Sequence, residues 1–126
     1  MIVAITGARG VIGTVLMARL ADRHTLIPVT RGEPLPGGRV ADLADEDALV
    51  RAFAGCDGVV HLAGASAVDS SWPQVHDANI VGTYNVFEAC RRAGVRRVVF
   101  ASTNHTVGMF EEAAFLQQFS PCRSYG

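Results

Sequence analysis

Apolar and polar segments alternate along the chain in a way that predicts strands and helices in turn. Short apolar runs predict strands at 2–5, 25–30, 39–41, 58–62 and 98–102. Helical patterns cover 15–20, the residues after Asp45, and 73–93. Strands that alternate with helices are typical of a parallel sheet with right-handed crossovers. We therefore expect an α/β fold, a doubly wound parallel sheet of about five strands.

Two of the predicted helices carry clear boundary signals. Asp45 is expected to cap the helix that Gly55 closes. The long helix over 73–93 begins with a proline in its first turn and is followed by Gly94. Gly82 lies on its apolar face, where glycine costs about 1 kcal/mol relative to alanine. We therefore expect close packing at Gly82.

The segment Thr6-Gly7-Ala8-Arg9-Gly10-Val11-Ile12-Gly13 joins the first strand to the first helix. Gly7 permits a tight turn, Gly10 lets the backbone approach phosphates, and Gly13 lets the helix pack closely on the strand. Unpaired N–H groups at the start of the helix would face the anion. This position and spacing predict a Rossmann-type fold that binds a dinucleotide. The alternative is a glycine-rich turn without a ligand.

Composition narrows the class of protein. The chain has 126 residues, of which 49% are hydrophobic and 18% charged, with a net charge of −1. These values indicate one globular core and give no electrostatic reason to expect a nucleic acid or an acidic membrane as partner. No apolar run is as long as a membrane-spanning helix, which needs about 20 residues. The N-terminus does not resemble a signal peptide. We expect a cytoplasmic location.

The three cysteines are widely spaced along the chain. Cys56, Cys90 and Cys122 fit reduced thiols better than a disulfide framework or a metal site. Cys90 falls on the apolar face of the long helix, so we expect it to be a small buried residue. No metal site is predicted.

Five motifs in order resemble the extended short-chain dehydrogenase/reductase family, which includes the nucleotide-sugar epimerases and dehydratases. They are the turn at 6–13, Asp42-Leu43, His61-Leu62-Ala63-Gly64, Asn79-Ile80-Val81-Gly82-Thr83 and the strand from Val98 to Ser102. The resemblance covers essentially the whole chain. It implies that residues 1–126 form one NAD(P)-binding Rossmann domain, truncated at the C-terminus relative to the full family fold. Family members often dimerise through helices that include the one at 73–93. A homodimer is therefore one possible assembly of this chain.

The resemblance also implies a set of cofactor contacts in the glycine turn and at the strand ends. They are Gly7, Arg9, Gly10, Val11, Ile12, Gly13, Arg31, Asp42, Leu43, Leu62, Ala63, Gly64 and Asn79. His61 lies within a predicted buried strand and is expected to be structural.

The residues after the second strand bear on the choice between NAD and NADP. An acid there would bind the ribose 2′-hydroxyl of NAD, but the chain has Thr30-Arg31. Arg9 adds a second cation, and both arginines suit a 2′-phosphate by bidentate charge pairing. The arginines therefore favour NADP over NAD. The alternative is that they are solvated surface charges.

The segment from Phe100 to Gly108 is similar to one group within the family, the uronate dehydrogenases, which oxidise hexuronic acids at C1 to aldarolactones. That group typically uses NAD, whereas Arg9 and Arg31 favour NADP. By this resemblance Thr103 supplies the catalytic hydroxyl, Asn104 and His105 bind a sugar-acid substrate, and Ser66 is a further substrate contact. The alternatives are a capping or loop histidine at 105 and an ordinary turn serine at 66.

In this family the catalytic base is the tyrosine of a Tyr-x-x-x-Lys pair, whose phenolate takes the substrate hydroxyl proton. Tyr125 lies 22 residues after Thr103, about where that tyrosine is expected, although a tail tyrosine without function is the alternative. The lysine would fall after Gly126. We therefore expect the cofactor-binding N-terminal part of a uronate dehydrogenase-like oxidoreductase, inactive alone.

Three other interpretations stay open. The chain could belong to a nucleotide-sugar epimerase or dehydratase, which retains tightly bound NAD, or be a non-catalytic NAD(P)-binding module. A truncated remnant with neither role would leave the sheet edge at the fifth strand uncovered, which favours oligomers.

Overall fold

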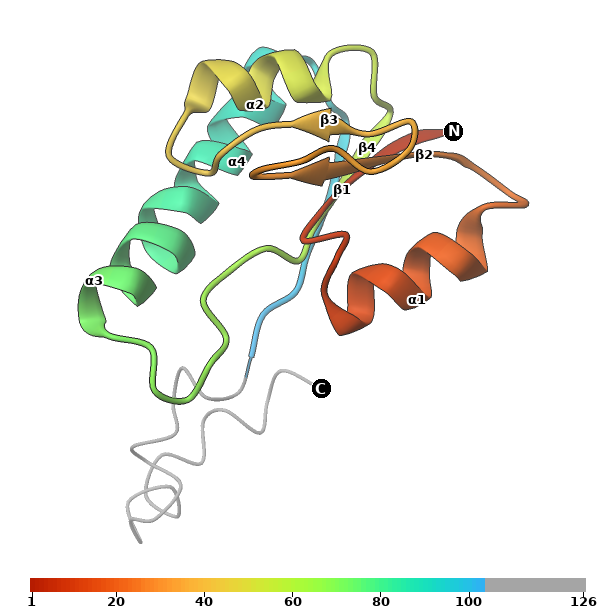
Figure 1. The fold of residues 1–126 in the computed structure, drawn as a ribbon. Coiled ribbons are helices and arrows are strands. Elements are labelled where there is room, and N and C mark those ends of the chain that lie inside the picture. The colour runs from red at the N-terminus through yellow and green to blue at the C-terminus, as the bar shows by residue number, and fades with distance from the viewer. Residues whose placement is uncertain (104–126) are drawn as a thin grey trace, which may run out of the picture.

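The computed structural model describes residues 1–103, which form a five-stranded parallel sheet with helices on both faces (Figure 1). The strands are β1 (Ile2–Thr6), β2 (Thr25–Thr30), β3 (Arg39–Val40), β4 (Gly58–His61) and β5 (Arg97–Phe100). The helices are α1 (Val11–Leu20), α2 (Glu46–Phe53), α3 (Trp72–Val75), the π-helical segment η1 (His76–Val81) and α4 (Gly82–Arg92).

The sheet order is β3-β2-β1-β4-β5, and every pairing is parallel. The chain moves outward from β1 to β3, then returns through α2 to place β4 on the other side of β1. Figure 1 shows α1 on one face of the sheet and α2, α3 and α4 on the other. Thr6 pairs with His61 across β1 and β4, so both strands end at the same edge. This point, where the strand order reverses, is where open α/β sheets bind ligands.

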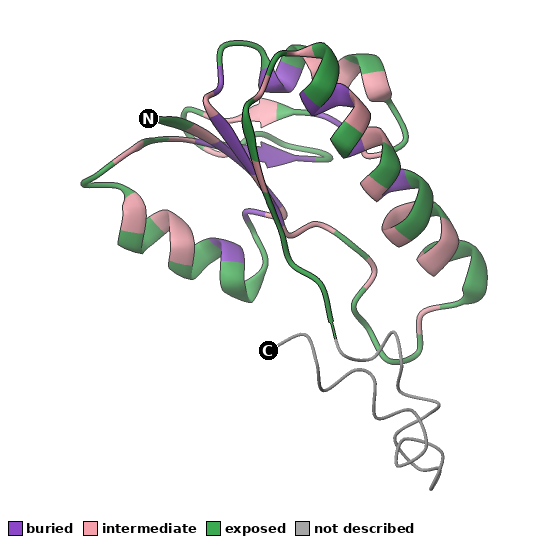
Figure 2. Ribbon diagram, turned by 180° about the vertical axis from the view of Figure 1, so that it is seen from behind, coloured by how far each residue is buried: buried purple, intermediate pink, exposed green. Residues whose placement is uncertain are grey.

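The core lies between the sheet and the pair α2 and α4. Leu49 and Phe53 of α2 and Val86 of α4 are fully buried, and they pack with buried strand residues such as Ala4 and Val59. Figure 2 shows the buried residues along the strands and on the inward sides of these helices. Removal of this apolar surface from water is the main force that fixes both helices on the sheet.

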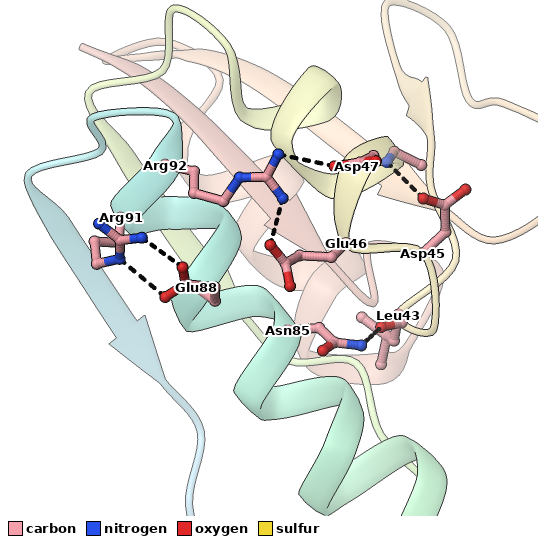
Figure 3. A network of polar contacts seen from close by, with 9 residues as sticks. Leu43, Asp45, Glu46, Asp47, Asn85, Glu88, Arg91 and Arg92 are labelled. Carbon is pink, nitrogen blue, oxygen red and sulfur yellow. Dashed lines mark hydrogen bonds and ion pairs between the residues drawn. The ribbon is translucent and has the colours of Figure 1, made fainter.

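Polar contacts at the ends of α2 and α4 complete this layer (Figure 3). The Asp45 side chain accepts a hydrogen bond from the Ala48 backbone N–H at 2.8 Å, which confirms the predicted cap. Arg92 of α4 pairs with Glu46 and, at 2.8 Å, with Asp47 in the first turn of α2. The two acids also lie at the positive end of the α2 dipole.

The structure differs from the predicted elements in the long helix, in the start of the first helix and by one or two residues at several strand ends. The helix predicted over 73–93 is divided into α3, η1 and α4, because six residues from His76 to Val81 form wider π turns. The first helix begins at Val11, directly at the glycine turn, and β5 ends at Phe100. Within residues 1–103, no helix is long and apolar enough to cross a membrane, and no group of acidic, histidine or cysteine side chains could hold a metal ion.

Candidate functional site

The glycine turn between β1 and α1 packs directly on the segment that follows β4. Gly7 has a φ of 69°, which an L side chain rarely adopts, and a Cβ there would lie 2.8 Å from the Ala63 nitrogen. Gly13 faces back onto the turn, where a Cβ would lie 2.3 Å from the Gly7 carbonyl oxygen. The close approach predicted for Gly13 is thus to the turn itself. The two glycines bring α1 and the end of β4 against one tight turn.

The N-terminus of α1 is open to a ligand. Gly10 is its N-cap residue, and in the described part of the chain no side chain caps the helix and no acid lies in its first turn. Val11 and Ile12 of that turn are 86% and 59% exposed. A Cβ at Gly10 would meet only the Gly7 carbonyl oxygen, at 3.2 Å, so one side of the turn faces open space. Uncapped N–H groups at a helix N-terminus are suited to a phosphate.

A shared backbone acceptor holds the loop after β2. The Glu33 carbonyl oxygen accepts hydrogen bonds from the Arg9 guanidinium and from the Thr30 hydroxyl, both at 2.9 Å. Arg9 therefore joins the glycine turn to this loop and is not simply a solvated charge. Arg31 follows β2 directly and is exposed. The glycine turn thus supplies a cation tethered to this loop, Arg9, and the loop itself supplies Arg31; both side chains are exposed.

The Asp42-Leu43 pair lies after β3 and is held by α4. The Asn85 side-chain amide donates to the Leu43 carbonyl oxygen at 2.8 Å (Figure 3). A Cβ at Gly82 would lie 2.9 Å from the Leu43 Cβ, which shows the close packing predicted for Gly82. Asp42 is exposed, and its carboxylate accepts from the Ala44 N–H at 2.9 Å.

The ends of β1 and β4 share a buried polar cluster. The Thr6 hydroxyl lies 2.7 Å from His61 Nδ1, and His61 Nε2 lies 3.1 Å from the Thr83 hydroxyl. His61 is fully buried, and burial lowers its pKa from 6.5 to about 4. The imidazole is therefore neutral at pH 7. Its position agrees with the structural role expected for this residue.

Asn79 fixes the backbone that follows this cluster. Its side-chain oxygen accepts from the Ala65 N–H at 2.7 Å, and its side-chain nitrogen donates to the Ala65 carbonyl at 2.9 Å. A Cβ at Gly64 would lie 2.7 Å from the Asn79 side-chain oxygen, so the two segments are in close contact. Ser66, predicted to contact substrate, is exposed one residue further on.

The predicted catalytic and substrate residues fall largely beyond the described chain. Thr103 is described and is exposed, shortly after the end of β5. Asn104, His105 and Tyr125 lie outside the described residues. Both described cysteines are buried free thiols, and burial raises the pKa of Cys90 to about 11. Neither thiol is placed or ionised for nucleophilic chemistry.

The arrangement therefore offers an anion site at a helix N-terminus, flanked by the ends of four parallel strands. The glycine turn, Arg31, Asp42-Leu43 and the Leu62–Gly64 segment all follow strands that end at this edge. Sequence reasoning gave no role to Glu33 or Asn85, which position the loops through backbone contacts. It also gave none to the hydroxyls of Thr6 and Thr83. A threonine and a histidine that each end an apolar strand are the one signal that could have indicated this cluster.

The chain is similar to a known protein family and to several known enzymes. The model of the NAD dependent epimerase/dehydratase family matches residues 3–126. A uronate dehydrogenase of Agrobacterium fabrum is 41% identical over 128 residues, which cover 97% of this chain and 48% of the relative. An L-arabinose 1-dehydrogenase (NAD(P)(+)) of Haloferax volcanii is 46% identical over 112 residues, which cover 88% and 44%. The chain thus spans about half the length of these relatives.

Solved structures show the same fold. The crystal structure of uronate dehydrogenase from Agrobacterium tumefaciens superposes with a TM-score of 0.75 at 40% identity, over 83% of this chain and 41% of that one. A mutant of that enzyme, solved in complex with NAD, superposes with the same score over 83% of this chain and 42% of that one. The predicted doubly wound parallel sheet is confirmed.

Proposed function

This chain belongs to the NAD dependent epimerase/dehydratase family, and on that premise we propose that it is the cofactor-binding part of an NAD(P)-dependent sugar-acid dehydrogenase. The observation that carries the proposal is the uncapped α1 N-terminus, which opens onto the glycine turn where the strand order reverses. A dinucleotide pyrophosphate would lie against these N–H groups. Asp42-Leu43 and the Leu62–Gly64 segment are the proposed contacts of its adenosine half.

Nucleotide binding by the 126-residue chain is the first test. We expect saturable binding of NAD and NADP in calorimetric titrations. Gly10→Ala is the matched variant, because its Cβ meets only one atom of the protein at 3.2 Å but occupies the open side of the turn. We expect this variant to keep the fold and to bind at least tenfold more weakly, about 1.4 kcal/mol. Absence of binding by the folded wild type would contradict the proposal.

We further propose that Arg31 is the residue that selects NADP. It is an exposed cation directly after β2, where an acid would instead bind the 2′-hydroxyl of NAD. Arg31→Ala should weaken NADP binding by about tenfold and leave NAD binding unchanged, since only NADP carries the charged partner. Arg19→Ala, at the far end of α1, is the control for loss of a positive charge. Equal losses for both nucleotides would instead assign Arg31 a general role.

For the complete protein we propose oxidation of a hexuronate to its aldarolactone. Bound NAD(P) would supply the acceptor for the hydride that leaves the sugar C1. The Tyr125 phenolate takes the hydroxyl proton, and Thr103 holds the reacting oxygen. Asn104, His105 and Ser66 are the proposed sugar-acid contacts. The support is the similarity to a uronate dehydrogenase, which is 41% identical over 97% of this chain.

The complete gene product is assayed with glucuronate, galacturonate and L-arabinose, because the relatives include both uronate and arabinose dehydrogenases. NAD(P)H should appear with a hexuronate, and the 126-residue chain should give no turnover. Nucleotide that co-purifies through repeated washing would favour an epimerase or dehydratase. Nucleotide binding without turnover of any sugar by the complete protein would indicate a non-catalytic module.

A further inference from the structure

His61 has both ring nitrogens engaged by threonine hydroxyls and none of its surface exposed. Nδ1 lies 2.7 Å from the Thr6 hydroxyl and Nε2 lies 3.1 Å from the Thr83 hydroxyl. One face of the ring stacks on Phe100, with centroids 5.5 Å apart. The ring thus joins β1, β4, α4 and β5 from inside the fold. It cannot exchange a proton with a ligand, so any influence on a site must pass through its partners.

Counting donors and acceptors around the Thr6 hydroxyl fixes the direction of these bonds. The Leu62 and Ala63 N–H groups, which can only donate, lie 3.2 and 3.3 Å from the Thr6 hydroxyl oxygen. The Leu62 N–H also reaches the Thr6 carbonyl, at 3.3 Å. A hydroxyl oxygen accepts two hydrogen bonds, so both acceptor positions are used. The remaining O–H of Thr6 must therefore donate to His61 Nδ1.

This direction determines the tautomer of the imidazole. A nitrogen that accepts carries no proton, so in the neutral ring the proton lies on Nε2 and is donated to Thr83. The opposite tautomer would direct a third N–H donor at the Thr6 hydroxyl oxygen, whose two acceptor positions are already used by the Leu62 and Ala63 amides. The buried surroundings also favour the neutral ring, since they lower the pKa of His61 to about 4.

The amides held by Thr6 belong to the segment on which the glycine turn rests. A Cβ at Gly7 would lie 2.8 Å from the Ala63 nitrogen and 2.8 Å from the Leu62 carbonyl carbon. We propose that His61, as its Nε2–H tautomer, is a positioning residue for this turn. It directs the Thr6 hydroxyl so that its oxygen faces the Leu62 and Ala63 amides and holds them beneath Gly7. That the turn binds a nucleotide rests on the proposed function.

Two near-isosteric variants separate the two sides of the ring. In His61→Asn the side-chain oxygen can replace Nδ1 as acceptor from Thr6, whereas in His61→Gln the amide nitrogen can replace Nε2 as donor to Thr83. The proposal requires the Nδ1 side. We expect Asn to preserve slow hydrogen exchange of the Leu62 and Ala63 amides, and Gln to accelerate it by about tenfold. NAD affinity should follow the same order.

Long-range proton–nitrogen NMR spectra of wild-type chain at pH 7 test the tautomer without any substitution. We expect an unprotonated Nδ1 and a protonated Nε2. An Nδ1–H tautomer would overturn the proposal, and so would equal amide exchange in the Asn and Gln variants. If either variant fails to fold, the tautomer decides the proposal for His61, and Thr6→Val and Thr6→Ser test the contact of the Thr6 hydroxyl with the two amides, with loss of protection expected for Val and rescue for Ser.

The exchange measurements also separate this proposal from the proposed function. The exchange pattern and the tautomer are read in the chain without nucleotide. If both hold and the wild type does not bind NAD or NADP, the proposed function fails and the positioning of the turn stands. If the wild type binds and the Asn and Gln variants bind equally, His61 does not position the nucleotide turn.

Discussion

We expect His61 to make the stability of the protein depend on pH. Its pKa is lowered by burial from 6.5 to about 4, so the unfolded chain takes up a proton near pH 6.5 and the folded chain only near pH 4. Between these values the unfolded state binds more protons. The contribution of His61 to stability is therefore complete above pH 6.5 and declines as the pH falls from 6.5 to 4. The loss amounts to about 3 kcal/mol at most.

Urea unfolding across this pH window measures the effect. Carboxylates titrate in the same range, so the quantity of interest is the difference between the wild type and His61→Asn. We expect the wild type to lose more stability than this variant as the pH falls. Parallel curves for the two proteins would show that the folded state protonates His61 as readily as the unfolded state does.

For single residues, the sequence predicted where the residues of the site lie better than which groups they contact. The glycine spacing correctly indicated the tight turn, and Gly7 has the expected left-handed conformation. The bond between Thr6 and His61 joins residues 55 apart and exists because β1 and β4 pair in one register. Local composition does not specify that register. The same holds for Arg9, whose bond to the Glu33 carbonyl depends on the path of a loop.

Among the elements, the π segment η1 is the main departure from the predicted helix. Periodicity at 3.6 residues per turn assumes α-helical geometry throughout, so it does not distinguish a π-helical segment from an α-helix. Asn79 lies within η1 and pairs through both amide groups with the Ala65 backbone. This contact ties the helical layer to the end of β4. Such π turns are frequent at functional sites.

Asn79→Asp tests the contribution of η1 to the site. The change keeps the shape but replaces the donor to the Ala65 carbonyl by a negatively charged oxygen. We expect a loss of about 1–3 kcal/mol in the free energy of unfolding, because the carbonyl faces an acceptor. Asp77→Asn, an exposed exchange in the same segment, should change it by less than about 0.5 kcal/mol. Equal effects in chemical denaturation would mean that the pairing with Ala65 is not stabilising.

For the molecule as a whole, the alternation of strands and helices predicted the parallel sheet and its right-handed crossovers. The order β3-β2-β1-β4-β5 places every predicted cofactor contact after a strand or on the helix that packs there. The substrate side of the site is different. Ser66 follows β4 and Thr103 follows β5, whereas Asn104, His105 and Tyr125 lie outside the described residues, so the described fold does not bring this set together.

The edge at β5 predicts how the chain behaves in solution. Among the described strands β5 pairs only with β4, and Val99 on it is 61% exposed. An apolar edge strand with unpaired backbone groups is a template for association. We therefore expect sedimentation velocity to show self-association that increases with concentration. Val99→Lys should suppress it without loss of the fold, because a charged edge resists strand pairing.

Two further variants decide which surface associates. Val98 packs against the core, so Val98→Lys should unfold the chain, which separates edge effects from loss of structure. Tyr84 on α4 is 67% exposed, and it tests the alternative, a homodimer through the long helix. If Tyr84→Lys abolishes association and Val99→Lys does not, the α4 face is the interface. A single monomeric species at every concentration would contradict association through either the β5 edge or the α4 face.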